Sequence, residues 1–242
     1  MTQYLLNATG KVLLLSGAWG GVGQAIMTQY VASGGAVIAL DRAAGPSTDQ
    51  VTSVICDVTQ EDEVKAAVER ALKDHDHIDA VVHAAGVVGS GQVQDTRLED
   101  WHRVMDANLT SAFLLARATH GALKASRGSM ILLGSTNGFN GGSPLSGAAY
   151  ASAKAALSNL GRHLAKTWSP EVRVNVVAPG PVATPMLDRL DEDVMTNLKA
   201  SLLTGELIQA DEVAAAVAFL ISDNARSITG TTLNLSGGLV LN

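Results

Sequence analysis

Apolar residues along this chain fall into short continuous runs rich in Val, Leu and Ile, and the longer segments between these runs repeat apolar positions at helical spacing. A short apolar run bounded by turn residues is typical of a strand that is buried on both faces of a sheet. We expect strands at residues 12–15, 36–40, 51–56, 80–83, 129–133, 173–178 and 232–235. We expect helices at residues 22–33, 61–74, 99–125, 148–168 and 211–222.

The regular alternation of strands and helices indicates the fold class. Parallel strands joined by helices form a sheet that is covered on both faces, so we predict a doubly wound, Rossmann-type α/β fold with a seven-stranded parallel sheet. A chain of 242 residues fits this architecture as a single domain over residues 1–242.

Loops rich in Gly and Pro follow three of the predicted strands, at residues 86–91, 138–147 and 179–185. In a doubly wound sheet the carboxyl ends of the strands form the ligand crevice, so we expect these loops to surround a binding site. Residues 184–206 are the least regular part of the chain. We predict a flexible helical flap there, and an ordinary surface excursion fits the same pattern.

Charge and cysteine content narrow the classes of partner. A net charge of −6 without any cluster of Lys and Arg disfavours binding to nucleic acid or to an anionic membrane. Cys56 is the only cysteine, so it has no partner for an internal disulfide, and we expect a cytoplasmic protein. The chain opens at residues 1–4 without a basic run, and the apolar run 12–15 is too short for a signal core, so we predict no targeting segment.

A glycine-rich turn directly follows the first predicted strand and opens the first predicted helix. It contains Gly17, Trp19, Gly21, Val22 and Gly23. Glycines let the backbone turn tightly and approach a pyrophosphate, whose negative charge is stabilised by the N–H groups and dipole at a helix N-terminus. The position of this turn between a strand and a helix predicts a dinucleotide site rather than a purely structural turn.

Asp41 ends the second predicted strand, at the spacing expected of an acid that accepts hydrogen bonds from the adenosine ribose. A carboxylate there would repel the additional phosphate of NADP, so we predict NAD as the cofactor. The neighbouring Arg42 leaves an alternative open. Its guanidinium could bind a 2′-phosphate, or it could stack on adenine or remain in solvent.

Two further strand ends carry candidate cofactor contacts. Asp57 and Val58 follow the third predicted strand, where they could meet the adenine edge, although Asp57 could equally cap the next helix. The small residues Ala84, Ala85 and Gly86 follow the fourth predicted strand and leave room for a cofactor beside the sheet.

Tyr150 and Lys154 are four residues apart within a predicted helix, which places both side chains on one helical face. A phenol titrates near pH ~10, so it becomes an effective base at neutral pH when a fixed cation stabilises its phenolate. Lys154 is in the position to supply that cation. Considered alone, the pair also fits an ordinary surface helix.

The ordered set of motifs resembles the classical short-chain dehydrogenase/reductase family, from about residue 10 to residue 241. The motifs are Ser16-Gly17-x-x-x-Gly21-Val22-Gly23, His83-Ala84-Ala85-Gly86, Asn108, Ser135, Tyr150-x-x-x-Lys154 and Pro179-Gly180. The resemblance implies a catalytic domain that binds a nicotinamide cofactor and interconverts alcohols and carbonyl compounds.

The resemblance also implies roles for single residues. Tyr150 matches the general acid/base, and Lys154 matches the lysine that lowers the pKa of the tyrosine and holds the nicotinamide ribose. Ser135 matches the serine that hydrogen-bonds the substrate oxygen. Asn108 matches the asparagine that holds a water in a proton relay, and it also fits a helix-interior asparagine with local hydrogen bonds.

A second group of roles concerns the nicotinamide ring and the assembly. Pro179, Gly180, Val182 and Thr184 resemble the segment that meets the carboxamide. The apolar chain end at residues 239–241 fits a subunit contact, so we expect a homotetramer by resemblance, with a dimer as the alternative.

Departures from the family pattern affect the expected site. His83 replaces an asparagine and is expected to be structural rather than catalytic. Ser135 lies fifteen residues before Tyr150, which is farther than usual in the family. The six histidines show no metal-ligand spacing, so we predict no metal site.

The sequence thus predicts an NAD-dependent oxidoreductase that acts on a secondary alcohol or ketone. The pocket candidates indicate a neutral or partly apolar substrate, while Arg189 on the flap leaves acids open. These candidates are Val87, Val88, Asn137, Phe139, Leu145 and Met186.

Other functions remain as alternatives on the same fold. A non-catalytic nicotinamide sensor would have a broken catalytic set, and a lyase or dehalogenase would carry arginine at position 154. An enoyl reductase would space the tyrosine and lysine more widely.

Overall fold

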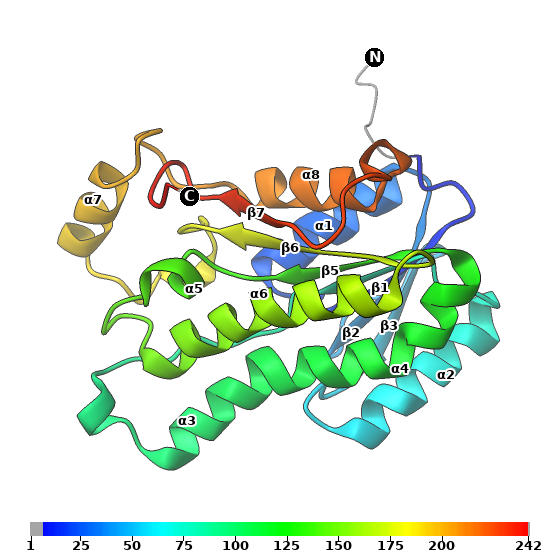
Figure 1. Ribbon diagram of the computed structural model, residues 1–242, viewed down its shortest axis with the longest axis horizontal. Coiled ribbons are helices and arrows are strands. Elements are labelled where there is room, and N and C mark those ends of the chain that lie inside the picture. The colour runs from blue at the N-terminus through cyan, green and yellow to red at the C-terminus, as the bar shows by residue number, and fades with distance from the viewer. Residues whose placement is uncertain (1–6, 242) are drawn as a thin grey trace.

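A computed structural model describes residues 7–241, and its centre is one parallel sheet of seven strands in the order β3-β2-β1-β4-β5-β6-β7 (Figure 1). The predicted fold class is confirmed, and each predicted strand is present to within one residue at either end. The strands are β1 (Val12–Ser16), β2 (Ala36–Asp41), β3 (Val51–Ile55), β4 (Ala80–His83), β5 (Ser129–Leu133), β6 (Arg173–Pro179) and β7 (Thr232–Leu235). The expectation about targeting rested partly on residues 1–4, which lie outside the described range.

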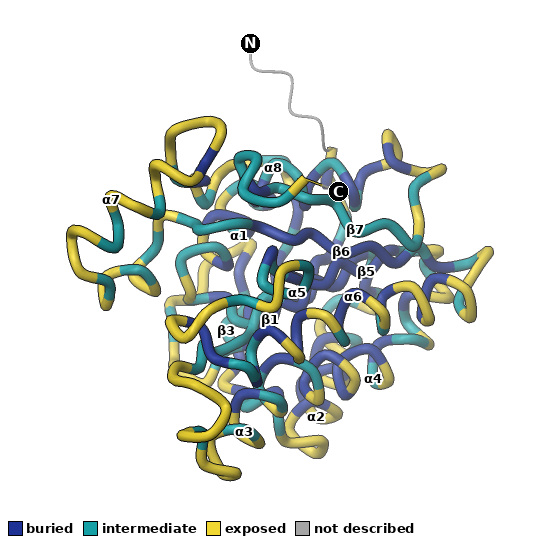
Figure 2. Tube along the Cα trace, turned by 60° about the vertical axis from the view of Figure 1, so that its left-hand side comes forward, coloured by how far each residue is buried: buried dark blue, intermediate teal, exposed yellow. Residues whose placement is uncertain are grey.

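Helices cover both faces of the sheet. On one face α1 (Gly21–Ala32) packs against α8 (Ala210–Ile221), and the other face carries α2 (Glu61–His75), α4 (Ser111–Ser126) and α6 (Ala148–Trp168) (Figure 1). Alternate strand residues enter opposite cores, as the pleat of a strand requires. The buried central layer is continuous through the molecule (Figure 2).

The chain reverses direction across the sheet at β1. This strand pairs with β2 on one side and with β4 on the other, so the chain first builds the sheet outward to β3 and then returns to continue through β7. The loops after β1 and β4 therefore diverge and leave a crevice at their carboxyl ends.

The predicted helix 99–125 is wrong in one respect, because it is not a single α-helix. It consists of α3 (Leu98–Met105), the π-helical segment η2 (Asp106–Thr110) and α4. The side chain of Asn108 donates to the Val104 carbonyl at 2.8 Å, and Ser111 Oγ donates to the Ala107 carbonyl at 2.9 Å. Such contacts compete with the backbone ladder, and hydrophobic periodicity does not register them.

Several short elements occur in segments predicted as loops or as the flap. They are η1 (Val93–Asp95), α5 (Asn137–Asn140), η3 (Pro185–Leu187), α7 (Glu192–Ala200) and η4 (Asp223–Ala225). Helix α7 stands away from the sheet at one end of the molecule (Figure 1). The predicted helical character of residues 184–206 is present, and the flexibility of this flap stays a prediction. Among residues 7–241, no helix is long and apolar enough to cross a membrane.

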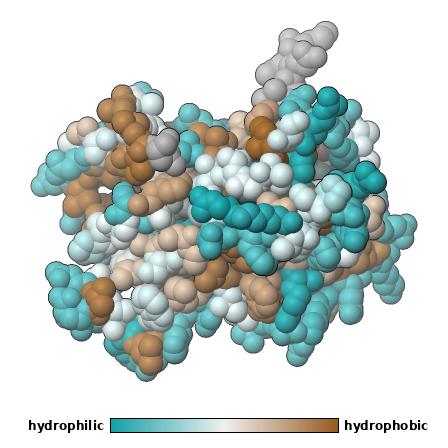
Figure 3. Space-filling view, viewed as in Figure 1, coloured by the Kyte–Doolittle hydropathy of each residue, from teal (hydrophilic) through white to brown (hydrophobic). Residues whose placement is uncertain are grey.

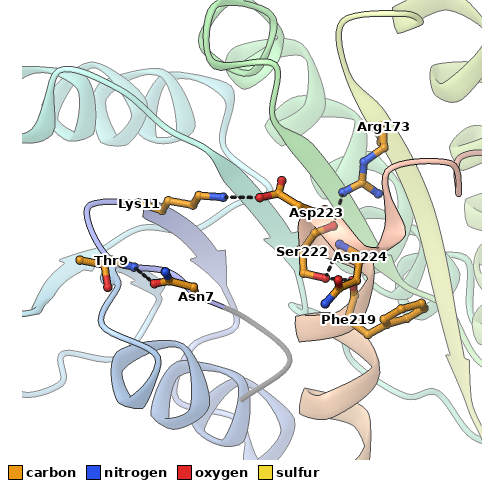
Figure 4. A network of polar contacts seen from close by, with 8 residues as sticks. All are labelled: Asn7, Thr9, Lys11, Arg173, Phe219, Ser222, Asp223 and Asn224. Carbon is orange, nitrogen blue, oxygen red and sulfur yellow. Dashed lines mark hydrogen bonds and ion pairs between the residues drawn. The ribbon is translucent and has the colours of Figure 1, made fainter. Parts of the chain in front are cut away.

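Arg173 fastens the end of α8 to the start of β6, at the edge of the sheet opposite the crevice (Figure 4). Its guanidinium donates to the carbonyls of Leu220 at 2.7 Å, Ile228 at 3.2 Å and Ser222 at 3.3 Å. A cation at a helix C-terminus satisfies carbonyls that lack intrahelical partners and stabilises the negative end of the helix dipole. This arginine therefore has a structural explanation and is not a candidate for the site.

Candidate functional site

A cleft of about 1040 Å³ lies at the carboxyl ends of the strands. Its walls come from α6, the π-helical segment, the flap and the loops after β1 to β6. Every residue that the sequence suggested for catalysis or cofactor binding lines this one cleft. They are Gly17, Trp19, Gly21, Val22, Gly23, Asp41, Arg42, Asp57, Val58, Ala84, Ala85, Gly86, Asn108, Ser135, Tyr150, Lys154, Pro179, Gly180, Val182 and Thr184.

The glycine turn after β1 is packed too tightly for other residues. Gly17 has φ +68°, and a Cβ there would lie 2.6 Å from the backbone nitrogen of Ala85, while a Cβ on Gly23 would collide with the Gly17 carbonyl. Helix α1 then begins at Gly21 with no capping side chain and no acidic residue in its first turn. Its N–H groups and positive dipole end suit an anion such as a pyrophosphate.

Asp41 holds a fixed negative charge at the end of β2. Its carboxylate accepts hydrogen bonds from the backbone N–H groups of Trp19 at 3.0 Å and Ala43 at 3.2 Å. These bonds tie the glycine turn to the second strand. Arg42 lines the same part of the cleft and is exposed.

Asp57 does not cap the following helix, so that alternative is wrong. Helix α2 has Gln60 at its N-cap, and the Asp57 carboxylate instead accepts from the backbone N–H and the hydroxyl of Thr59, at 3.0 and 2.7 Å. The aspartate closes the turn before the helix and leaves its charge on the cleft wall.

Lys154 is buried in the cleft floor, one turn along α6 from Tyr150. Its ammonium donates to the Leu133 carbonyl at 2.7 Å and lies 5.5 Å from the centre of the Tyr150 ring. Burial lowers the pKa of Lys154 to about 8, because the charged form has lost most of its hydration.

The pKa of Tyr150 does not follow the expected direction. Burial raises the pKa of this phenol, while a hydrogen bond with Ser135 and the positive charge of Arg189 act against that rise. Lys154 is not among the groups that shift this pKa, and its ammonium is bonded to the Leu133 carbonyl. Lowering of the phenol pKa by Lys154 stays a prediction. The hydrogen bond between Ser135 and Tyr150 shows that the two side chains come together although Ser135 lies fifteen residues before Tyr150.

Asn108 places an unpaired acceptor beside Lys154. Its amide nitrogen donates to the carbonyls of Val87 and Val104, both at 2.8 Å, and its oxygen is buried without a partner among residues 7–241. A Cβ on Gly86 would lie 2.5 Å from that oxygen and 3.6 Å from the Lys154 nitrogen. The absent side chain at Gly86 thus keeps open the space between the two groups.

Comparison with known proteins agrees with this geometry. A family model described as Enoyl-(Acyl carrier protein) reductase matches residues 17–240. The chain is 34% identical over 247 residues to the 3-oxoacyl-[acyl-carrier-protein] reductase FabG of Escherichia coli (strain K12), covering 98% of this chain and 100% of that protein. The chain belongs to the classical short-chain dehydrogenase/reductase family.

Two further relatives extend the comparison. The acetoacetyl-CoA reductase of Acinetobacter sp. (strain RA3849) is 31% identical over 245 residues, covering 96% of this chain and 98% of that protein. A crystal structure titled short-chain dehydrogenase/reductase SDR:Glucose/ribitol dehydrogenase, from Brucella melitensis, has a TM-score of 0.92 and 28% identity, covering 98% of this chain and 99% of that one. This short-chain dehydrogenase/reductase is an oxidoreductase, and its family uses a nicotinamide cofactor.

The cleft fits such a cofactor on structural grounds. The uncapped N-terminus of α1 suits the pyrophosphate, and the Asp41 carboxylate suits ribose hydroxyls. The buried, unpaired oxygen of Asn108 and the ammonium of Lys154 lie at the other end. No cluster of side chains suited to a metal ion occurs within the described range.

The end of the cleft beside Tyr150, called here the substrate end, was only partly predicted. Val87, Val88, Asn137, Leu145 and Met186 line it, whereas Phe139 does not and was wrongly included. Phe139 lies in α5, and a helix directs neighbouring side chains to different faces. The sequence reasoning missed other residues of this end because no motif marks them and the fold alone brings them together. They include Ser143, Ser146, Leu190, Leu198 and Leu239.

Proposed function

We propose that this short-chain dehydrogenase/reductase transfers a hydride between NAD(H) and a secondary alcohol or its ketone, with Tyr150 as the general acid/base. The observation that carries the proposal is the convergence of Ser135 and Lys154 on Tyr150 within one cleft. Geometry of this kind positions a carbonyl oxygen, supplies a proton and stabilises developing charge.

Each side chain has a separate task in the reduction direction. A nicotinamide cofactor held by the glycine turn and Lys154 would supply the hydride for the carbonyl carbon. The Tyr150 hydroxyl donates its proton to the carbonyl oxygen, and the Ser135 hydroxyl donates a hydrogen bond to the same oxygen as negative charge develops there. Lys154 stabilises the phenolate that Tyr150 becomes. The free oxygen of Asn108 would accept a hydrogen bond from a water that passes the replacement proton towards Lys154. Oxidation of the alcohol uses the same groups in reverse.

Replacing Tyr150 tests this assignment directly. Tyr150→Phe removes the transferable proton and keeps the ring, so we expect kcat to fall by about 10²–10⁴-fold with cofactor affinity within about twofold of wild type. Steady-state turnover of a panel of ketones and a fluorescence titration with cofactor provide the two measurements. Undiminished turnover by the variant would refute the role of Tyr150.

Asp41 supports NAD over NADP. Its fixed carboxylate would lie against the additional phosphate of NADP, and like charges brought together in a site weaken binding. We expect wild type to bind NADH at least about tenfold more tightly than NADPH, and Asp41→Ala to reduce that ratio. Titration of both proteins with both cofactors measures it. Tighter binding of NADPH by wild type would mean that Arg42 determines the preference.

Ketone reduction is favoured over two other functions. The relatives named 3-oxoacyl-[acyl-carrier-protein] reductase and acetoacetyl-CoA reductase act, by name, on 3-oxoacyl compounds. The family description names an enoyl reductase, and the four-residue interval between Tyr150 and Lys154 argues against that reaction here. A sensor without turnover would not need the complete set of Ser135, Tyr150 and Lys154.

We also propose that the protein is cytoplasmic and forms a homotetramer, with a dimer as the alternative. Light scattering on the purified protein would distinguish the tetramer from the dimer.

A further inference from the structure

Arg189 extends from the flap to the substrate end of the cleft. It follows η3, lines the cleft, and donates from Nη2 to the backbone carbonyl of Leu145 at 2.7 Å. Leu145 lies in the loop between α5 and α6, so this hydrogen bond joins the flap to the opposite wall. The guanidinium is close enough to Tyr150 for its charge to act on the phenol.

The charges along the cleft are divided between its two ends. Asp41, Arg42 and Asp57 lie at the end formed by the loops after β2 and β3, where the adenosine of the proposed cofactor would bind. The end near Tyr150 is lined by Lys154 and Arg189, and no acidic side chain of the described chain lines it. Arg189 forms no ion pair among residues 7–241. An arginine that acts on Tyr150 and forms no ion pair favours an anionic ligand.

Apolar side chains surround this charge. Leu145 and Met186 flank the cleft and are 44% and 47% exposed. Apolar side chains also gather on the surface beside α7 (Figure 3). The lining residues Leu190, Leu198 and Leu239 add to this apolar wall, so the substrate end combines one cation with several aliphatic groups.

We propose that Arg189 binds an anionic group of the substrate, so that the enzyme prefers a short oxo acid or hydroxy acid to the corresponding neutral compound. This inference rests on the proposed ketone and alcohol chemistry. Arginine presents five N–H donors in a planar fork, of which one is used by the Leu145 carbonyl, and the fork suits carboxylate and phosphate oxygens. The apolar wall suits the short carbon chain of such an acid.

Matched pairs of probes test the preference. Reduction of 3-oxobutanoate is compared with that of its methyl ester, and reduction of dihydroxyacetone phosphate with that of dihydroxyacetone, each with NADH and with NADPH. The acid of a pair gains a charge-assisted contact with Arg189, so wild type should have a kcat/KM at least about tenfold higher for one acid than for its neutral partner. The two pairs separate a carboxylate from a phosphate. Added salt should lower kcat/KM for the acid more than for the neutral partner.

Substitution separates binding from a purely structural contact. Arg189→Gln should lower kcat/KM for the preferred acid about tenfold, mainly through KM, and leave the neutral partner within about twofold after correction for any shared change in kcat. Arg189→Lys, which keeps the charge without the fork, should recover part of the loss. Arg162→Gln removes an exposed arginine of α6 that does not line the cleft, and it should change neither ratio.

Several outcomes would overturn the proposal and leave the proposed function intact. One is that wild type reduces the neutral compounds, or other neutral ketones, with a kcat/KM equal to that for the acids. Another is that Arg189→Gln lowers kcat/KM equally for the acid and for its neutral partner. Arg189 would then be only a structural contact with the Leu145 carbonyl. An enzyme that binds the cofactor but reduces no ketone of any charge would instead refute the proposed function itself.

Discussion

His83 and Lys154 are two ionisable side chains that lie near each other in the buried centre of the molecule. The imidazole Nε2 and the Ser111 hydroxyl are 2.8 Å apart, and that hydroxyl donates onward to the Ala107 carbonyl, so His83 acts as the donor to Ser111. Burial, with a smaller effect from the charge of Lys154, lowers the pKa of His83 to about 3. The histidine therefore supports the π-helical segment in its neutral form, in agreement with the structural role predicted for it.

The neutral His83 should make the protein sensitive to acid. Its pKa is about 3 in the folded protein and about 6.5 in an unfolded chain, so below pH ~6.5 the unfolded state binds a proton that the folded state does not. The free energy of unfolding should fall as the pH decreases between these values. We expect wild type to lose about 2 kcal/mol more than His83→Asn between pH 7 and pH 5, as measured by urea denaturation.

An exposed histidine provides the control for this measurement. His163→Asn removes a histidine from the exposed face of α6, and its pH dependence should match that of wild type. Equal pH dependence of His83→Asn and wild type would contradict the buried neutral state of His83.

At the level of elements, α6 packs close to the sheet at Gly161. A Cβ on Gly161 would lie 2.7 Å from a methyl group of Val176, which is buried in β6. This close approach brings the helix that carries Tyr150 and Lys154 against the strands that end at the cleft. A Cβ on Gly121, in α4, would have no neighbouring atom within 4 Å.

These two glycines make a matched pair of helix substitutions. Gly161→Ala should lower the free energy of unfolding by about 1–2 kcal/mol, because the overpacked methyl group outweighs the gain in helix propensity. Gly121→Ala should raise it by about 0.5–1 kcal/mol, because only the propensity changes. Denaturant unfolding of both variants at pH 7 measures the difference, and stabilisation by both substitutions would contradict the close packing.

On the scale of the whole molecule, the cleft is a product of the sheet topology. Residues from the turn after β1, the end of β2, the π-helical segment and α6 are separated by long stretches of chain, yet parallel strands bring their carboxyl ends to one edge. The opposite edge carries structural contacts such as those of Arg173. Catalytic candidates and stabilising contacts are thus divided between the two ends of the same strands.

Much of this arrangement was predictable from the sequence. The apolar runs located all seven strands, since a strand buried on both faces leaves a continuous pattern. The glycine turn, Asp41 and the Tyr150 and Lys154 pair could be recognised because each depends on local spacing within one element or one strand end. The helix 148–168 was also predicted with its correct bounds.

Other features depend on contacts between segments distant in sequence, and only the tertiary structure decided them. Asn108 is held in the cleft wall by its bond to the Val87 carbonyl, and Arg189 by its bond to the Leu145 carbonyl. The pKa of Tyr150 depends on burial and on neighbouring charge. The sequence by itself determined the order of elements and the residues that reach the edge of the sheet, because both follow from short-range periodicity. Electrostatics and the shape of the substrate end follow from packing, which a one-dimensional pattern does not contain.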